Sequence, residues 1–411
     1  MANVEMPPWA GYASAVNIVL FAIPSMWALR WWLGVRDGVL LFAVLGIYAL
    51  IIESLAIATG FPYGHFDYST ALGYRILGYS PWTVAFAWTP LILGIYAAAA
   101  RMIGNAAGRI AATAIGLTFV DMVLDPGAVF LGFWRYADPG IYYGVPWSNF
   151  AGWVISGAVG AALIEIFLRL RPSLLPAPMQ LMWSLLLIIF FWTAFAVFAG
   201  MPLPFILGTL MLAALVWAYR RYHYRFDEML VLVDDEGRAT GTMPKSEVHH
   251  SDTPLHSAFS VFLFDDQGRT LMQRRAFSKV TWPGVWSNSC CGHVMLHEDV
   301  SSAAKRRVKY ELGTVAADIE VAVPDFRYRA ERDGVVENEI CPVLVGRLSG
   351  DAAPRADEIA ETKWVEWREL VAMANDPDSS LSPWAAEEVM LLNAKRELMS
   401  KFLGPDDILD Q

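Results

Sequence analysis

Lysine is missing from the first part of the chain and first occurs at Lys245. Acidic residues are also sparse there, and long stretches of Leu, Ile, Ala, Phe and Trp are interrupted mainly by scattered arginines. The mean hydropathy of the whole chain, +0.38, is too high for an ordinary soluble protein. No dense Lys/Arg patch occurs, which argues against a nucleic-acid partner. The sequence therefore divides into an apolar first half and a second half of ordinary soluble composition.

Cysteine is also rare, and all three cysteines, Cys290, Cys291 and Cys341, lie in the second half. A disulfide between the two adjacent ones is geometrically awkward, so a reducing compartment fits best. Residues 1–10 have no basic side chain and include two prolines. We therefore expect the first apolar segment to be a retained span and not a cleaved signal peptide.

A helix needs about 20 apolar residues to cross the hydrocarbon layer of a membrane. Suitable segments occur at residues 12–33, 39–59, 81–100, 110–132, 150–168, 181–200 and 203–219. They predict an all-α polytopic membrane bundle of about seven spans within residues 1–223, embedded in the lipid bilayer. Residues 224–411 predict a soluble α/β domain that follows it.

Arginines flank alternate connections between these segments and indicate their orientation. One side of the predicted bundle carries Arg30, Arg36, Arg101, Arg109, Arg169, Arg171, Arg220 and Arg221. The other side has only Arg75 and Arg135. Because cytoplasmic loops carry the excess of basic residues, we predict an integral protein of the inner (cytoplasmic) membrane. Its N-terminus would lie outside and its soluble domain in the cytoplasm.

Four carboxylates lie within the predicted spans, where an ionisable group costs about 2.5–3.5 kcal/mol on insertion scales. Glu165 is close to Arg169 at a helix end, and we expect it to serve helix packing. Glu53, Asp121 and Asp125 are the candidate functional residues of the membrane half. The two aspartates are four residues apart, so on a helix they point to one face and could share a proton.

Two aromatic-rich segments, residues 60–68 and 132–146, lie in the connections on the outer side. The matching pieces of a known family are Glu53, Pro62-Tyr-Gly64, Asp121, Asp125-Pro126, Tyr143-Gly-Val-Pro146, Asn149 and Trp153. In these pieces the first half resembles the carotenoid-biosynthesis membrane family that includes the carotenoid 1,2-hydratases, such as bisanhydrobacterioruberin hydratase. The resemblance implies a carotenoid or other polyene substrate in the membrane.

Hydration of a terminal prenyl double bond would start with proton delivery from a buried carboxylic acid and would proceed through a tertiary carbocation. Aromatic faces can stabilise such a cation. The candidates for this role are Phe61, Tyr63, Trp134 and Tyr143. Three alternatives stay open: a carotenoid cyclase, a prenyltransferase suggested by the spacing of Asp121 and Asp125, and a non-catalytic membrane anchor.

The last apolar segment runs into the soluble half without a Gly/Ser/Pro linker. Strand signals follow at residues 228–233, 259–264, 270–273 and 341–345, and helical signals at 300–312 and 385–401. This mixture predicts a layered α/β domain.

Metal-ligand residue types gather in this half. Cys291 and His293 are two residues apart, as are Glu337 and Glu339, and in an extended chain this spacing places both side chains on one face. With His249 and His256 they offer three imidazoles and two carboxylates, a credible shell for a divalent metal such as Zn²⁺, Mn²⁺ or Mg²⁺.

The residues around His293 also keep the frame of a Nudix box. The frame consists of Gly292, Glu298, Arg306, Glu311 and Gly313. Arg307 and Tyr310, however, stand where hydrolytic Nudix enzymes carry glutamates. A Nudix pyrophosphohydrolase is therefore the alternative for this half, and it would lack some of its metal ligands.

The segment Thr281-Trp-Pro-Gly-Val-Trp-Ser-Asn-Ser-Cys-Cys-Gly-His293, with residues 307–313, 325–329 and Glu337-Asn-Glu339, resembles type 1 isopentenyl-diphosphate isomerase of the Nudix superfamily. The resemblance implies interconversion of isopentenyl and dimethylallyl diphosphate. Cys291 and Glu339 would act on opposite faces of the substrate, in interchangeable roles, with Tyr328 assisting and Trp384 stabilising the cation.

The resemblance also implies two metals and a diphosphate site. His249, His256, His293, Glu337 and Glu339 would hold Mn²⁺, Zn²⁺ or Mg²⁺, and Glu311 would hold Mg²⁺ on the diphosphate. The diphosphate itself would be bound by Lys245, Arg275, Lys279 and Arg307. The sequence departs from the family at Val294, where proline is usual, and at His297, where glycine is common.

Overall fold

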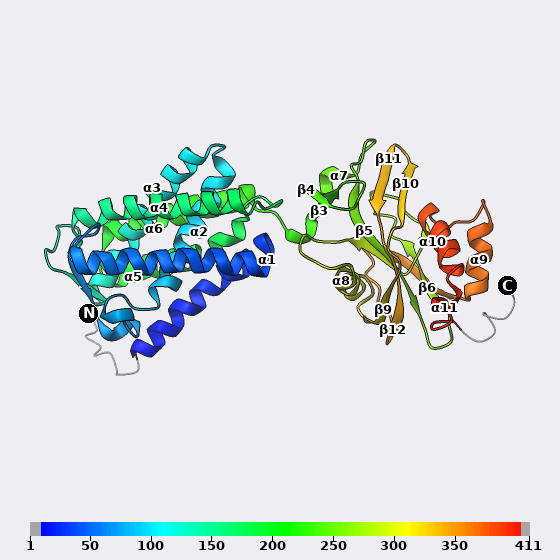
Figure 1. The fold of residues 1–411 in the computed structure, drawn as a ribbon, viewed down its shortest axis with the longest axis horizontal. Helices are drawn as coiled ribbons and strands as arrows, with labels where there is room; N and C mark the ends of the chain where they lie inside the picture. The colour runs from blue at the N-terminus through cyan, green and yellow to red at the C-terminus, as the bar shows by residue number, and fades with distance from the viewer. Residues whose placement is uncertain (1–9, 404–411) are drawn as a thin grey trace. The chain divides into compact units, whose positions relative to one another are not determined.

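A computed structural model of the chain describes residues 10–403. The chain forms two compact units, one ending at Tyr224 and the other beginning at Arg225 (Figure 1). Each unit has its own fold and is described separately.

The first unit is a helical bundle. Its helices are α1 (Ala10–Thr59), α2 (Val84–Met102), α3 (Ala106–Phe130), α4 (Trp147–Leu170), α5 (Met182–Phe198) and α6 (Pro202–Tyr222). Within residues 10–403, six helices are long and apolar enough to cross a membrane. Helix α1 covers the first two predicted spans and is broken at Gly34, where φ is 77° and ψ is 170°, a combination that glycine adopts readily. The break is visible in Figure 1 as a sharp bend. The count of about seven spans stays a prediction.

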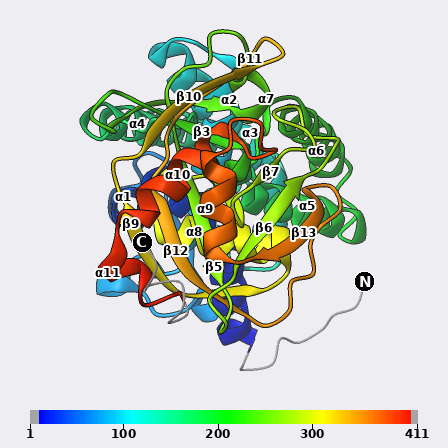
Figure 2. The ribbon, with the colours of Figure 1, turned by 90° about the vertical axis from the view of Figure 1, so that its right-hand side faces the viewer.

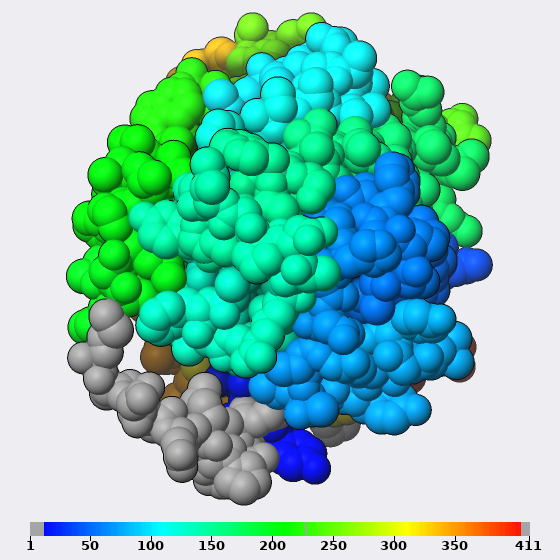
Figure 3. Space-filling view, turned by 90° about the vertical axis from the view of Figure 1, so that its left-hand side faces the viewer, coloured from blue at the N-terminus to red at the C-terminus, as the bar shows by residue number. Residues whose placement is uncertain are grey.

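A small antiparallel hairpin joins the two aromatic-rich segments. Strand β1 (Phe66–Tyr68) pairs with β2 (Trp134–Tyr136), with Tyr68 opposite Trp134. The 3-10 turns η1 (Thr70–Leu72) and η2 (Ile76–Gly78) follow β1, and η3 (Met179–Leu181) precedes α5. Figure 3 views this end of the unit, where the segment after α1, in blue, lies beside the segment after α3, in blue-green.

The second unit is built on a mixed sheet. Its strands are β3 (Met229–Val233), β4 (Ala239–Pro244), β5 (His256–Phe264), β6 (Thr270–Arg275), β7 (Trp286–Ser287), β8 (Cys290–His293), β9 (Val315–Val323), β10 (Arg327–Arg332), β11 (Val335–Ile340), β12 (Val343–Ser349) and β13 (Ile359–Val365). Strand β5 is central. The strands β11 and β12 run parallel to it along one edge, and β8 pairs antiparallel with the other edge.

Helices cover both faces of this sheet (Figures 1 and 2). Helix α8 (Val300–Leu312) packs on one face, against Phe259, Val261 and Leu263 of β5. Helices α9 (Trp367–Asn375), α10 (Pro383–Asn393) and α11 (Arg396–Met399) pack on the other, against Phe262 and Phe264. The short helix α7 (Lys245–Val248) follows β4. Alternate residues of β5 thus face different layers, and the strand is apolar on both sides, as expected for a buried parallel pairing.

Helix α8 shows how local sequence sets an element. Asp299 caps its start by accepting a hydrogen bond from the Ser302 amide at 2.9 Å, and Gly313 ends it with φ 65° in the left-handed region.

The ends of two other elements differ from the sequence prediction. The strand expected at residues 341–345 starts only at Val343, because Pro342 has no N–H for a ladder bond. The helix expected at 385–401 divides after Asn393 into α10 and α11.

Candidate active sites

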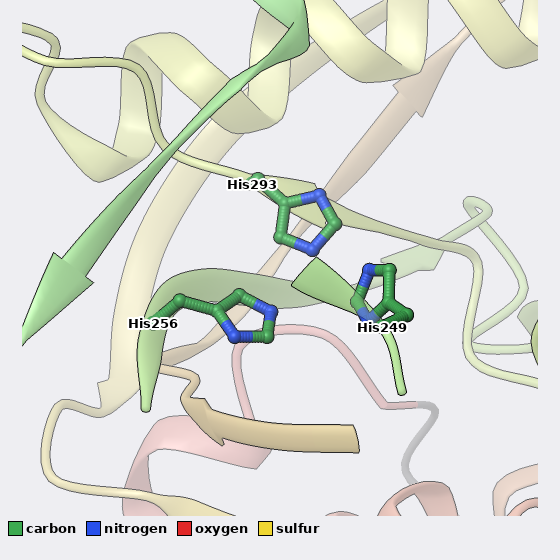
Figure 4. A group of neighbouring side chains, drawn as sticks. All are labelled: His249, His256 and His293. Atoms are coloured by element: carbon green, nitrogen blue, oxygen red, sulfur yellow. The ribbon is translucent and has the colours of Figure 1, made fainter. Parts of the chain in front are cut away.

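Five of the predicted metal-ligand residues lie in the second unit and converge from four elements. His249 caps the end of α7, His256 begins β5 and His293 ends β8. Glu337 and Glu339 lie on β11, with Glu339 directly opposite His256 in the ladder. Figure 4 shows the three imidazole rings turned toward one another.

The distances in this cluster are short. One nitrogen from each histidine lies within 4.8 Å of the others, and His256, Glu337 and Glu339 form a second group of the same size. The Nε2 atoms of His256 and His293 each lie 3.3 Å from Oε1 of Glu339. His249 Nδ1 lies 3.4 Å from Glu337 Oε2.

The donor set fits a divalent metal. His256 Nδ1 lies 2.9 Å from the Pro254 carbonyl, which can only accept, so this nitrogen carries the proton and Nε2 presents its lone pair to Glu339. Nε2 of His256 and His293, Nδ1 of His249 and Oε2 of Glu337 are buried without a hydrogen-bond partner among the described residues. Acceptor atoms that face each other in this way need a shared cation or proton.

Burial sets the charge of these ligands. It lowers the pKa of His249 to about 4 and that of His293 to about 3, so both rings are neutral near pH 7 and able to ligate. Burial and the neighbouring Glu339 raise the pKa of Glu337 to about 7. Burial opposes ionisation of Glu339 as well, but when no cation is bound a proton shared with His256, whose own pKa Glu339 raises, and a hydrogen bond with His293 hold the pKa of Glu339 well below its usual range.

Cys291 and Glu339 lie on the same face of the sheet, although they come from different strands. Cys291 is opposite Ser260 of β5, and Glu339 is opposite His256. Cross-strand partners share a face, and residues 256 and 260 are an even number of positions apart. The thiol and the carboxylate therefore project to one side of β5 from the strands on its two edges. Cys290 points to the other side and packs in the α8 layer.

Cys291 is a half-buried residue, and its sulfur lies close to a buried guanidinium. Arg275 Nη1 lies 3.7 Å from its Sγ, and Arg275 Nη2 donates to the Thr281 carbonyl at 2.9 Å. Burial raises the pKa of Cys291 to about 12 in spite of the opposing effect of Arg275. The thiol is therefore protonated near neutral pH and suited to donate a proton.

Aromatic rings form a wall on this face. The Tyr328 hydroxyl donates to Glu339 Oε2 at 2.9 Å, and the Tyr328 ring stacks on Trp384 with centroids 5.3 Å apart. Trp282 meets Trp384 edge to face at 5.4 Å, and Trp384 is fixed by a 3.1 Å hydrogen bond to Ser287. The guanidinium carbon of Arg275 lies 5.9 Å from the centroid of the Trp384 ring, so this wall already borders a cation on the face that carries Cys291 and Glu339.

Three of the four predicted diphosphate ligands form a separate charged group. Lys279 is ion-paired with Glu358, and Arg307 with Glu311. Arg307 Nη2 also lies 3.4 Å from Glu358. Lys245, an exposed residue at the start of α7, has its pKa lowered by partial desolvation and by the neighbouring charges of Lys279 and Arg307. Arg275, the fourth predicted ligand, lies beside Cys291 and also interacts electrostatically with Glu311.

Gly292 allows β8 and α8 to meet at this point. A Cβ atom on Gly292 would lie 3.1 Å from Cγ of Arg307, tighter than ordinary van der Waals contact. Glu358 was missed by sequence reasoning because it lies outside the Nudix frame, in the loop before β13.

Glu388 is a second missed residue. It lies on α10, one turn after Trp384, and is fully buried on the face that carries the site. Its carboxyl oxygens have no hydrogen-bond partner among the described residues. Burial raises the pKa of Glu388 well above its usual range, against an opposing contribution from the Ser260 hydroxyl, and Glu339 adds to the increase. A glutamate within an amphipathic helix gives no sequence signal of burial.

We expect the Glu388→Gln variant to be more stable than the parent at neutral pH, by about 1–3 kcal/mol. Because the folded-state pKa is raised, the parent loses stability as pH rises through the unfolded-state value of about 4.5. The amide has no such dependence. Thermal unfolding of the second unit in the detergent-solubilised chain, at about pH 5 and about pH 8, checks this. An equal change at both pH values would contradict it.

In the first unit, Asp121 and Asp125 share one polar network. The Asn149 amide donates to Oδ2 of Asp121 at 2.6 Å and to Oδ2 of Asp125 at 2.8 Å. Asp125 also accepts from Trp134 Nε1 at 2.5 Å and from the Tyr136 hydroxyl at 2.8 Å. Both aspartates are buried. The network ties α3 to α4 and to the β1–β2 hairpin.

Glu53 belongs to a different feature, a cavity of about 400 Å³. The Tyr68 hydroxyl donates to Glu53 Oε2 at 3.0 Å. Among the described residues that line the cavity, Glu53 is the one carboxylate, and Asp121 and Asp125 are not part of the lining. Most of the wall is apolar, and four indole rings contribute to it: Trp88, Trp134, Trp153 and Trp192.

The remaining residues singled out in the first unit have other surroundings. Glu165 accepts hydrogen bonds from Arg109 at 2.6 and 2.8 Å and from Tyr96 at 2.9 Å. It therefore forms an ion pair that links α3 and α4. Of the four aromatic candidates, only Trp134 is in the described lining of the cavity. Phe61 is 56% exposed.

Comparison with known proteins agrees with this division. Residues 13–215 match the family described as carotenoid biosynthesis protein, and residues 254–385 match the NUDIX domain. An isopentenyl-diphosphate Delta-isomerase from Mycolicibacterium vanbaalenii is 52% identical over 168 residues, which are 41% of this chain and 92% of the relative. The corresponding protein from Frankia alni is 49% identical over 164 residues, 40% of this chain and 84% of the relative. That from Clavibacter michiganensis is 47% identical over 166 residues, 40% of this chain and 86% of the relative.

The layered sheet, helix α8 and the matched segment define the second unit as a Nudix domain. Within that class, the chain belongs to the isopentenyl-diphosphate delta-isomerase family. Its first unit is a carotenoid biosynthesis domain with several long apolar helices.

Proposed function

We propose that the second unit interconverts isopentenyl diphosphate and dimethylallyl diphosphate. The observation that carries this proposal is the placement of a protonated thiol, Cys291, and an ionised carboxylate, Glu339, on one face of the sheet beside the Tyr328–Trp384 stack. Moving a double bond along an unactivated C5 chain needs such an acid and base at one site.

The directions of the pKa shifts favour one assignment of roles. The Cys291 thiol donates a proton to the terminal CH₂ carbon, the π bond breaks, and a tertiary cation forms beside Trp384. Glu339 then removes a proton from the neighbouring CH₂ group, and the new double bond forms. The Tyr328 hydroxyl orients Glu339 through its hydrogen bond to Oε2. A proton then passes from Glu339 to the Cys291 thiolate, which restores both groups, and the reverse direction follows the same steps backward.

The charged group around Arg307 provides for the diphosphate. Lys245, Lys279 and Arg307 would bind its oxygens, and Glu311 is placed to hold a magnesium ion on it. The ligands His249, His256, His293, Glu337 and Glu339 would hold a second divalent ion, Mn²⁺, Zn²⁺ or Mg²⁺. Such ions supply charge stabilisation and keep the bound carboxylates ionised.

The test uses the full chain in detergent with isopentenyl diphosphate and Mg²⁺, followed by NMR in D₂O. We expect dimethylallyl diphosphate that carries deuterium in a methyl group. Release of inorganic phosphate without isomerised product would instead support the Nudix pyrophosphohydrolase.

For the first unit we propose addition of water to a terminal double bond of an acyclic carotenoid or similar polyene. The observation that favours it is the carboxylate of Glu53 in the wall of an otherwise largely apolar cavity rich in indole rings. Expression of the full chain in cells that make lycopene tests the proposal by product mass. A gain of one water supports it, an unchanged mass with a shifted absorption spectrum indicates a cyclase, an added prenyl unit indicates a prenyltransferase, and unaltered lycopene indicates an anchor.

A further inference from the structure

We infer that Glu53, and not the Asp121–Asp125 pair, is the acid that protonates the polyene, and that the cavity it lines receives the apolar end of the chain. The inference rests on the function proposed for the first unit and identifies its catalytic group. It rests on the position of Glu53, whose carboxyl group accepts a hydrogen bond from the Tyr68 hydroxyl and lines a cavity large enough for the end of an isoprenoid chain.

Asp125 has the wrong surroundings for this role, and Asp121, although its Oδ1 has no hydrogen-bond partner among the described residues, lies outside the described cavity lining. Asp125 accepts hydrogen bonds on both oxygens, from Trp134, Tyr136 and Asn149. Neither aspartate is in the described lining of the cavity. Their contacts instead tie Trp134 and the hairpin to α3, so Asp125 acts on the cavity through the Trp134 ring that it holds. We assign Asp125 the part of a positioning residue.

Glu53 has the opposite character. Its one hydrogen bond within the described residues is the 3.0 Å contact in which the Tyr68 hydroxyl donates to Oε2, and no basic group there lies within ion-pair distance. A carboxylic acid that accepts on Oε2 carries its proton on Oε1, which is then free to be delivered. Glu165 illustrates the contrast, because Arg109 holds it by two hydrogen bonds.

The proposed step is balanced in atoms and charge. The Oε1–H bond of Glu53 breaks as the hydrogen bonds to the less substituted carbon of the terminal alkene, and the π bond breaks to leave a tertiary cation. The oxygen of a water molecule adds to this cation and loses one proton to the Glu53 carboxylate. The net change is addition of H₂O, with Glu53 restored. The indole faces of Trp88, Trp134 and Trp153 in the cavity wall stabilise the cation.

Size and surroundings suggest which part of the substrate enters. The volume of about 400 Å³ lies near the low end of the roughly 300–1,000 Å³ of small-molecule sites, so a long polyene inserts only its end. At the wall, Phe21 of α1 meets Phe191 of α5 with ring centroids 6.1 Å apart, and Phe191 is exposed on the outer surface of the bundle. Bilayer lipid would cover that surface, so an apolar chain has a route from the membrane.

The test compares single substitutions in the full chain, expressed in lycopene-producing cells and normalised to the amount of protein in the membrane. We expect Glu53→Gln to lower water addition by about 10²–10⁴-fold, the contribution of a general acid, and Glu53→Asp to retain part of it. Ala87→Phe, which narrows the cavity and leaves Glu53 in place, should lower it more than about tenfold. Asp125→Asn should lower it less than Glu53→Gln, and Asp125→Glu, which keeps acceptor oxygens for Trp134 and Tyr136, should retain most of it.

Full water addition by a well-expressed Glu53→Gln variant, or loss of product only in Asp121→Asn and Asp125→Asn, would overturn the inference and leave the proposed function standing. A cyclised product that disappears in Glu53→Gln would refute the proposed hydration and support Glu53 as the acid, because both reactions begin with protonation. Unaltered lycopene with the parent chain would refute both. If the Glu53→Gln protein does not accumulate, the water addition measured for Glu53→Asp and Ala87→Phe tests the inference instead.

Discussion

Replacement of Cys291 by alanine should lower kcat/KM for isopentenyl diphosphate by about 10²–10⁴-fold, because the variant loses the proton donor of the proposed step. Burial raises the thiol pKa to about 12, so the side chain is a protonated thiol near pH 7 and can act as the acid. The loss should appear mainly in kcat, since the diphosphate ligands are unchanged. Steady-state kinetics of the detergent-solubilised chain measure it.

The neighbouring cysteine provides a matched control. Cys290 faces the α8 layer and is fully buried, so Cys290→Ala should cost a little stability and leave kcat close to that of the parent. Activity that survives in Cys291→Ala but is lost in Cys290→Ala would reverse the assignment of the two thiols.

Replacement of His293 by alanine should abolish metal binding at the histidine cluster and reduce isomerase activity by more than the roughly 10–100-fold typical of losing an outer-shell partner. The variant removes an imidazole that is neutral near pH 7, since burial lowers its pKa to about 3. It also leaves Glu339 Oε1 without the contact at 3.3 Å. Metal content by elemental analysis, measured beside kcat, tests this expectation.

His250 is the control for this experiment. It is exposed next to His249, and its Nδ1 accepts a hydrogen bond from the Asp252 amide at 3.0 Å, away from the cluster. His250→Ala should keep both metal content and activity. A His293→Ala protein with a full metal complement would show that the cluster does not bind the ion.

Short-range periodicity carried much of the sequence prediction. The spacing of two in Cys291/His293 and Glu337/Glu339 predicts shared faces, and both pairs lie on strands that flank β5. The spacing of four in Asp121 and Asp125 predicts a shared helix face, where both contact Asn149. Side-chain direction follows from backbone repeat, so such pairs are readable without a tertiary structure.

Features that depend on packing between distant segments could not be predicted from the sequence. The cavity beside Glu53 is lined from several helices and both hairpin strands, and no local pattern marks its indoles as neighbours. Glu358 and Glu388 become site-adjacent only through the fold. The break at Gly34, by contrast, falls between the two spans predicted at residues 12–33 and 39–59.

The pairing of β8 with β5 has a consequence for insertions and deletions near the active site. Because Cys290 and Cys291 face opposite layers, a slip of one position would carry a sulfur atom into the catalytic face while turning His293 toward α8. A one-residue deletion in the turn before β8 would thus preserve a thiol where the substrate binds and still yield a protein unable to hold its ion. Sequence variants of that turn should therefore be judged by metal retention, and not by thiol reactivity.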